Sequence, residues 1–290
     1  MNPRTGIARR YFTSPRQERC RVRPLEEGHD MLTLFHFGGA ICAQKVRLAL
    51  AEKGVEWESR ECAGEALRDP DYLRLNPSGV VPTLVHDRTV LTESRIISEY
   101  IEEAFDGPAL MPSDPADRHR ARLWSKQIDD GLHLNVFILT FAAVGRDIYL
   151  AMPADVRGAM LPGLRDPIKR QISSDLLEQG FASPWMGMAV KRFRRLADDM
   201  EAGLAGSAAL AGKHYSLADA DYTAYINRLT NLGMAALWAD KPRLADWYAH
   251  MQDRPSFKSA ILDWQSPEEL ASYGRSRDRV GEALDAIMVE

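Results

Sequence analysis

The sequence predicts an α/β domain followed by an all-α domain. Three observations indicate this. The chain has 290 residues, of which 45% are hydrophobic, so it is long enough to bury two ordinary cores. Its apolar pattern reads as strand, helix, strand over residues 32–61, and no convincing strand appears beyond Gly107-Pro108. We place the first domain at residues 31–107 and the second at residues 113–264.

The first domain opens with a short buried strand near residues 32–35, which Gly38-Gly39 end. An amphipathic helix is expected over residues 41–53 and a second strand over residues 55–61. The order strand, helix, strand favours a parallel pair with a right-handed crossover.

Two more strands and a helix complete this domain. Residues 82–86 and 89–92 are short apolar runs joined by Asp87-Arg88, a spacing typical of an antiparallel hairpin. A helix then begins at Thr92 or Glu93 and runs to Phe105, with its isoleucines on the buried side.

The second domain is predicted to be helical throughout. Its first helix begins at residues 113–115, where a cap precedes proline. Prolines and glycines break residues 152–166, which we expect to form an excursion between helices. Ser216 and Asp219 have the spacing of a capping box at a later helix start. We expect residues 265–290 to form a polar tail with one short helix.

The N-terminal residues 1–30 are rich in arginine and lack apolar periodicity. This composition is typical of a disordered leader, or of an upstream mis-start with Met31 as the true beginning. Acidic residues in the segment disfavour an organelle-targeting signal.

The composition excludes several classes of function. The net charge of −4, with both signs interspersed, disfavours nucleic acid as a partner. No apolar run of roughly 18 residues is evident, so we expect no membrane span and a cytoplasmic location. Seven scattered histidines make a metal site improbable, and three cysteines without a paired spacing predict reduced thiols.

Cys42 lies on the first turn of the predicted helix over residues 41–53, where amide dipoles favour negative charge. This position can stabilise a thiolate, either that of Cys42 or that of a bound thiol. The alternative is that Cys42 is a small apolar core residue, because free cysteine is among the most buried residue types. Position alone leaves the two interpretations open.

Two further motifs lie at strand ends and helix starts of the same domain. Residues 76–82 run from a turn into a strand through Val81-Pro82, which leaves the Val81 main chain able to pair with an extended ligand. Glu93-Ser94 can hold an ammonium group and a carboxylate, or can be a plain helix cap. A ligand with a thiol, a peptide backbone and an α-amino acid end would engage all three sites, and glutathione has those parts.

From Met31 to about Trp264 the chain resembles the glutathione transferase family, which combines a thioredoxin-like domain with a helical domain. The resemblance rests on residues 76–82, on Thr92-Glu93-Ser94 and on residues 215–219. It implies that the bond between Val81 and Pro82 is cis, that the Val81 main chain pairs with the cysteinyl part of glutathione, and that Glu93 and Ser94 hold its γ-glutamyl end. It further implies a homodimer and a small hydrophobic aromatic substrate.

Residues 40–47 and 247–257 look most like the bacterial branch of β-aryl etherases and tetrachlorohydroquinone reductive dehalogenases. Those dehalogenases carry serine two residues before the reactive cysteine, where this chain has Ala40, whereas Cys42 is kept. The leading hypothesis is therefore that the glutathione thiolate attacks an aromatic electrophile such as a β-aryl ether, with Cys42 assisting.

Two alternatives stay open. Cys42 is itself the nucleophile of a reductive dehalogenase or thiol-disulfide oxidoreductase, or the fold is a non-catalytic binding module. From helical spacing, Trp124, His133 and Phe137 are candidates for the wall of the substrate site.

Overall fold

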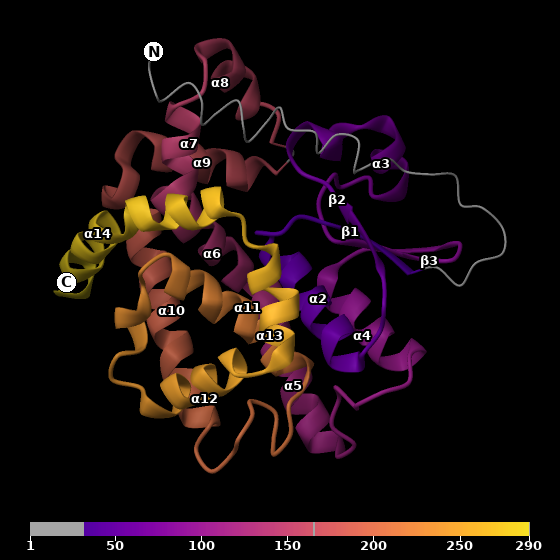
Figure 1. Ribbon diagram of the computed structural model, residues 1–290. Helices are drawn as coiled ribbons and strands as arrows, with labels where there is room; N and C mark the ends of the chain where they lie inside the picture. Colours follow the sequence, from indigo (N-terminus) through magenta and orange to yellow (C-terminus); the bar gives the residue numbers. More distant parts are fainter. Residues whose placement is uncertain (1–31, 165, 290) are drawn as a thin grey trace.

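The computed structural model describes residues 32–164 and 166–289 (Figure 1). The interpretation of residues 1–30 as a leader therefore lies outside the described residues, and so does Met31. The described chain forms a small four-stranded sheet with its helices, followed by a larger helical part. This arrangement confirms the predicted fold class.

The sheet has the strand order β2-β1-β3-β4. Its strands are β1 (Leu32–His36), β2 (Glu58–Glu61), β3 (Thr83–His86) and β4 (Thr89–Leu91). β1 pairs with β2 in parallel and with β3 antiparallel, and β3 and β4 form an antiparallel hairpin. The predicted parallel pair and hairpin are both confirmed, although β2 begins three residues later than residues 55–61 predicted.

Both faces of the sheet are covered by helices. On one face, Leu34 packs with Leu50 of α2 (Ile41–Lys53) and Ile97 of α4 (Ser94–Ala104). On the other face, Phe35 packs with Tyr72 of α3 (Pro70–Leu75). Residues 62–75, to which no element was assigned from the sequence, contain α3 and a short 3-10 turn, η2 (Gly64–Arg68).

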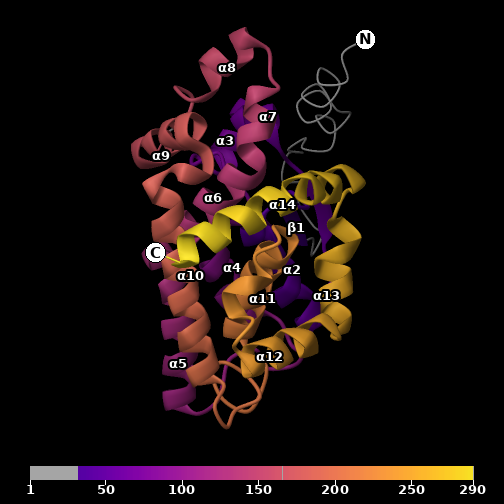
Figure 2. The same cartoon turned by 90° about the vertical axis from the view of Figure 1, so that its left-hand side faces the viewer.

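The helical part follows Asp114, whose carboxylate caps the first helix as predicted. Its elements are α5 (Pro115–Gln127), η3 (Ile128–Leu132), α6 (His133–Thr140), η4 (Phe141–Gly145), α7 (Arg146–Leu150), α8 (Ala154–Met160), α9 (Pro167–Gln179), η5 (Gly180–Ala182), α10 (Pro184–Gly203), α11 (Leu217–Asn231), η6 (Ala235–Trp238), α12 (Pro242–Gln252), α13 (Pro255–Ala260), η7 (Leu262–Trp264) and α14 (Pro267–Val289). The excursion that was expected between helices therefore contains α8, and α9 follows it (Figure 2).

The stretch Pro115–Leu150 is helical except for a kink at Gly131, whose φ of 133° and ψ of −10° are not helical, and it has wide turns at η3 and η4. By length and composition alone it is long and apolar enough to cross a membrane, although no such stretch was expected from the sequence. Leu132, Val136 and Leu139 of this stretch are buried in the hydrophobic core against the other helices. The same pattern is typical of the central helix of a helical bundle.

Helix α2 lies between the sheet and the helical part, and α11 and α13 pack against it. Arg47 on α2 is buried at 1% exposure and donates hydrogen bonds to the carbonyls of Gly38 and Ala260, each at 2.8 Å. A buried guanidinium needs such acceptors, because an unpaired buried charge is costly. Arg47 thus fastens the end of α13 to the first domain.

The prediction of a polar tail over residues 265–290 was wrong. They form one long helix, α14, whose Tyr273, Val280 and Leu284 are buried in the helical core. The charged residues between these sparse apolar positions hide the periodicity. The start of α14 also approaches the turn before α2, because a Cβ atom on Gly39 would collide with the carboxylate of Glu269. Glycine at position 39 permits this contact.

The expectation of reduced thiols is wrong for Cys62, which is buried and disulfide-bonded. Cys20 lies outside the described residues. Cys42 is a free thiol.

Candidate functional site

Cys42 is the second residue of α2, and its side chain is half-buried. The cap residue Ala40 has an extended backbone and no side-chain hydrogen bond to the helix. The first-turn amides of α2 consequently lack a side-chain acceptor from the cap. This leaves the partial positive charge of the helix N-terminus available to a thiolate.

His133 of α6 faces Cys42 from the helical part. The Cys42 Sγ atom lies 3.8 Å from His133 Nδ1, and the same nitrogen lies 2.9 Å from the hydroxyl oxygen of Tyr225 on α11. A thiolate accepts hydrogen bonds and does not donate them, so the arrangement that stabilises it places a proton on His133 Nδ1. Tyr225 holds the imidazole ring in position.

These contacts change the acidity of the thiol. Burial alone raises the pKa of Cys42, but the hydrogen bond and charge of His133, the charge of Lys45 and a hydrogen bond from Ser94 together lower this pKa to about 7. A free cysteine has a pKa of about 8.5. Near neutral pH, about half of the Cys42 side chains are therefore thiolates, the form that acts as a nucleophile.

Lys45 lies one helical turn after Cys42 on α2 and is buried at 1% exposure. Its Nζ atom lies 3.2 Å from Asp221 Oδ1 on α11 and donates a hydrogen bond to the Ser94 hydroxyl at 3.3 Å. The structure thus brings together Cys42 and Ser94, two of the residues singled out from the sequence. It also adds His133, Tyr225, Lys45 and Asp221 to the same cluster.

Glu93 and Ser94 lie at the start of α4. Glu93 is exposed and adopts φ 65° and ψ 107°, a conformation that non-glycine residues rarely occupy. Such strain costs about 1–3 kcal/mol and is concentrated at functional sites. Ser94 is half-buried as the first helical residue. Glu93 is not a plain helix cap, because its side chain makes no hydrogen bond to the helix.

The turn before β3 is held by side chains around the carbonyl of Val80. The hydroxyl of Tyr72 donates to this carbonyl at 2.6 Å, and Asn76 Nδ2 donates to it at 3.0 Å. The Val81–Pro82 peptide bond is cis. The pairing of β3 with β1 ends at Thr83, so Val81 lies outside the strand ladder. Its main chain is therefore not committed to the sheet.

The three candidates for the substrate wall have different surroundings. Trp124 is a core residue, since its indole donates to the Leu210 carbonyl at 2.9 Å and its ring packs edge-on against Tyr222. His133 contacts Cys42 directly. Phe137 is half-buried one turn further along α6, and its ring packs against Phe141. The spacing argument thus found a site residue in His133 and a core residue in Trp124.

Sequence reasoning missed Lys45, Asp221 and Tyr225. Two spacings carried a signal for them. Lys45 is three residues after Cys42, and Tyr225 is four residues after Asp221, so each pair shares one helix face. Which faces meet depends on packing between the two halves of the chain, which spacing does not reveal.

Among residues 32–164 and 166–289, no group of three or more His, Cys, Asp or Glu side chains is arranged to hold a metal ion. The cluster around Cys42 contains a thiol whose pKa is lowered to about 7, an imidazole and a buried ammonium group. This set can hold and activate an anionic sulfur atom.

Comparison with known proteins places these residues in a family. Residues 41–104 match the family model described as "Glutathione S-transferase, N-terminal domain". The chain is 30% identical over 241 residues to a tetrachloro-p-hydroquinone reductive dehalogenase of Sphingobium chlorophenolicum, a match that covers 79% of this chain and 95% of the relative. It is 41% identical over 100 residues to a stringent starvation protein A homolog of Histophilus somni, which covers 34% of this chain and 47% of that protein.

Among solved structures, the β-etherase LigF of Sphingobium sp. strain SYK-6 superimposes with a TM-score of 0.70 at 25% sequence identity. The superposition covers 80% of this chain and 99% of LigF. The fold, the family match and the nearly full-length match to the dehalogenase agree, and the chain belongs to the glutathione S-transferase family.

Proposed function

We propose that the protein is a glutathione-dependent enzyme that acts on a small hydrophobic aromatic compound and uses the thiolate of Cys42 as a nucleophile. One observation carries this proposal: Cys42 Sγ lies 3.8 Å from His133 Nδ1, in a site that brings the thiol pKa to about 7. A cysteine that serves only as packing gains nothing from such an arrangement.

The residues around Cys42 fit glutathione as a cosubstrate. Glu93 is an exposed carboxylate with no cap bond, suited to the α-ammonium group, and the Ser94 hydroxyl at the start of α4 is suited to the neighbouring carboxylate. The Val81 main chain beside Pro82 is suited to the cysteinyl backbone, since it lies outside the β1–β3 ladder. We therefore propose Val81, Pro82, Glu93 and Ser94 as the glutathione-binding residues.

The proposed reaction starts from an aromatic thioether, formed when the glutathione thiolate displaces a halide from the ring. The Cys42 thiolate attacks the sulfur of this thioether, and a disulfide forms between Cys42 and glutathione. The electron pair of the broken carbon–sulfur bond goes to the ring carbon, which takes up a proton. A second glutathione thiolate then attacks the disulfide, restores Cys42 and leaves as glutathione disulfide. The ring gains two electrons and two glutathione molecules are oxidised.

The role of Cys42 in this proposal differs from the one favoured by the sequence, in which Cys42 only assists the glutathione thiolate by donating a hydrogen bond. A lowered pKa makes the thiolate form of Cys42 more accessible near neutral pH, and a thiolate has no proton to donate. The pKa of Cys42 therefore favours the role of nucleophile.

The etherase remains a second candidate, supported by the superposition on LigF at a TM-score of 0.70. In that reaction the glutathione thiolate attacks the carbon that bears an aryl ether. A phenolate leaves and a glutathione thioether is the product, with no disulfide step and no net oxidation. Cys42 would then be dispensable for turnover.

The experiment compares wild type with the Cys42→Ser variant. Each is incubated with glutathione and with chlorohydroquinones, β-aryl ethers or a small mixed disulfide, and products are identified by mass. The proposal expects glutathione disulfide and a dehalogenated ring, or a reduced small disulfide, from wild type alone. A thioether that both proteins form would establish the etherase reaction instead. No product from any compound, with glutathione still bound, would favour a non-catalytic binding module.

We also propose that the enzyme is a cytoplasmic homodimer. Several large apolar side chains of the described chain are about half exposed, among them Val80 at 50%, Ile96 on α4 at 53% and Leu123 on α5 at 48%. Burial of such side chains against a second copy would stabilise an assembly. Sedimentation velocity on wild type and on a variant with Ile96→Glu tests this expectation, since the charge should produce monomers.

A further inference from the structure

Lys45 is a deeply buried cation on the same helix as Cys42, and the reaction proposed above gives it no role. Its only charged contact in the described chain is Asp221, at 3.2 Å, and the Ser125 hydroxyl donates to the other oxygen of that carboxylate at 2.7 Å. Lys45 belongs to the first domain, whereas Asp221 and Ser125 come from helices α11 and α5. A buried ion pair of this kind rarely adds stability over apolar packing, so a functional reason for it is worth seeking.

The first reason concerns Ser94. Lys45 Nζ donates a hydrogen bond to the Ser94 oxygen at 3.3 Å. An ammonium group can only donate, so this bond uses an oxygen lone pair and leaves the O–H of Ser94 as a donor. Lys45 therefore leaves the O–H of Ser94 able to donate either to the Cys42 sulfur or to a ligand carboxylate, and adds a positive charge behind it.

The second reason concerns Cys42. Lys45 follows Cys42 by one turn of α2, and its charge is one of the causes that lower the pKa of the thiol. The other groups that act on Cys42 or Lys45 are His133 on α6, Tyr225 on α11, Ser94 on α4 and Asp129 on η3. Among these described groups, Lys45 is the one permanently charged cation.

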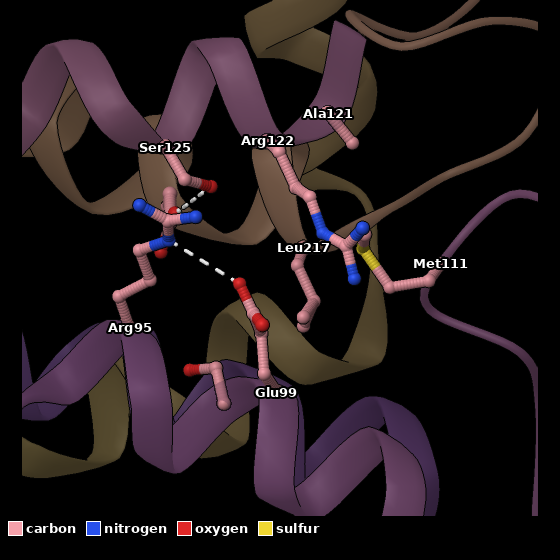
Figure 3. A pocket seen from close by; sticks show the side chains of 9 residues that line it. Arg95, Glu99, Met111, Ala121, Arg122, Ser125 and Leu217 are labelled. Atoms are coloured by element: carbon pink, nitrogen blue, oxygen red, sulfur yellow. Dashed lines mark hydrogen bonds and ion pairs between the residues drawn. The ribbon is translucent and has the colours of Figure 1, made fainter. Parts of the chain in front are cut away.

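The surroundings of Asp221 indicate from which side a ligand approaches. Beyond Asp221, α4 and α5 enclose a hollow of about 10 Å³ lined by Arg95, Glu99, Arg122 and Ser125 (Figure 3). A hollow of this size is at the lower limit for one water molecule. No peptide fits there, so a peptide ligand does not approach Lys45 through this hollow.

We propose that Lys45 is a positioning residue whose one buried charge serves both the γ-glutamyl carboxylate of bound glutathione, through Ser94, and the thiolate of Cys42. It orients the Ser94 hydroxyl toward the γ-glutamyl carboxylate and stabilises the thiolate of Cys42, while Asp221 of the helical part keeps it protonated. This inference rests on the proposed function for its ligand. The effect of the Lys45 charge on Cys42, however, can be tested without glutathione.

The test uses the double variant K45M/D221N, which removes both charges so that neither is left buried without a partner. The first readout is the pH dependence of Cys42 alkylation by iodoacetamide, followed through the mass of the peptide that carries Cys42. The second is calorimetric binding of S-methylglutathione, whose sulfur cannot ionise. S125A is the matched control, because it removes a contact of Asp221 and no charge.

In K45M/D221N the midpoint of Cys42 alkylation should rise by about one pH unit or more, and the affinity for S-methylglutathione should fall about tenfold or more. S125A should change neither value by more than about twofold. A folded double variant with the midpoint and affinity of wild type would overturn the proposal, because the pair would then be structural only.

A second measurement uses wild type and stays decisive if the double variant does not fold. Saturating S-methylglutathione places a carboxylate at Ser94, which competes with Cys42 for the charge of Lys45. The alkylation midpoint of Cys42 should therefore rise, and an unchanged midpoint would overturn the proposal. Failure of the proposed reaction appears separately, in the products formed from glutathione, and leaves the ligand-free alkylation result untouched.

Discussion

The Sγ atom of Cys42 and the Nδ1 atom of His133 lie 3.8 Å apart, although 91 positions separate them in the chain. Cys42 is on the first helix of the α/β domain and His133 begins α6 of the helical part. The acidity of the thiol therefore depends on how the two halves pack. In this protein the helical part therefore contributes to the lowered pKa of the Cys42 thiol.

His133→Ala should raise the pKa of Cys42, because it removes a hydrogen bond and a positive charge that favour the thiolate. A lowered thiol pKa means that reactivity appears as the pH rises through about 7. As the pKa rises, the thiolate fraction at pH 7 falls and alkylation at that pH slows. Alkylation rates measured from pH 5 to 10 test this shift.

Tyr225→Phe supplies the matched control for His133, because it removes the 2.9 Å contact to Nδ1 and keeps the imidazole. The alkylation midpoint should stay near that of wild type, because the hydrogen bond and charge of His133 are kept. If His133→Ala left the alkylation midpoint near 7, the contact between Cys42 and His133 would have no chemical role.

Glu93→Gly should separate ligand binding from stability. Glycine tolerates the backbone of residue 93, at φ 65°, so the substitution should not lower the free energy of unfolding. It removes a charged partner of the γ-glutamyl end worth about 1.5–3 kcal/mol, so glutathione affinity should fall about tenfold or more. Calorimetry and chemical denaturation on the same samples give both values.

Glu103→Gln is the control for Glu93, since Glu103 is an exposed carboxylate on the same helix, α4. Its glutathione affinity should equal that of wild type. Equal losses in both variants would mean that general electrostatics, and no specific contact, explain the effect.

Asp219→Ala should destabilise the helical part strongly. The Asp219 carboxylate is fully buried and accepts hydrogen bonds from Leu210, Ser216 and Trp247. Loss of this acceptor leaves several buried donors unsatisfied, at a cost of about 3–5 kcal/mol. Denaturant titration should show the loss, and Asp285→Ala, an exposed change on α14, should not.

Leu284→Ala should show that α14 is an integral part of the core. Leu284 is 2% exposed, and truncation of a buried leucine costs about 2–5 kcal/mol. Leu270 lies on the same helix at 46% exposure, so Leu270→Ala should change stability by about 0.5 kcal/mol or less. Similar effects of the two substitutions would mean that α14 does not pack as described.

The parts of the fold that were predicted correctly depend on residues close together in the sequence. A short buried apolar run predicted β1, and apolar residues at helical spacing predicted α2. Short apolar runs predicted the hairpin, and the spacing of Ser216 and Asp219 predicted the capping box that the structure contains. Each of these features depends on residues within a few positions of one another.

Features that depend on distant partners were missed. Lys45 is buried because Asp221 meets it from the other half of the chain, and periodicity along α2 does not reveal that partner. Helix α14 was mistaken for a tail because Tyr273, Val280 and Leu284 are widely spaced among charged residues. Similarly, the choice between a core cysteine and a nucleophile at Cys42 required the position of His133.

The central claim is that Cys42 becomes covalently linked to glutathione during turnover. The most direct test is to react the protein with a chlorohydroquinone and one equivalent of glutathione, quench with acid, and measure the mass of the peptide that carries Cys42. We predict that this peptide gains one glutathionyl group, that excess glutathione removes it, and that the Cys42→Ser variant makes no dehalogenated product. Dehalogenated product formed at the wild-type rate by Cys42→Ser, with no adduct on wild type, would contradict the account.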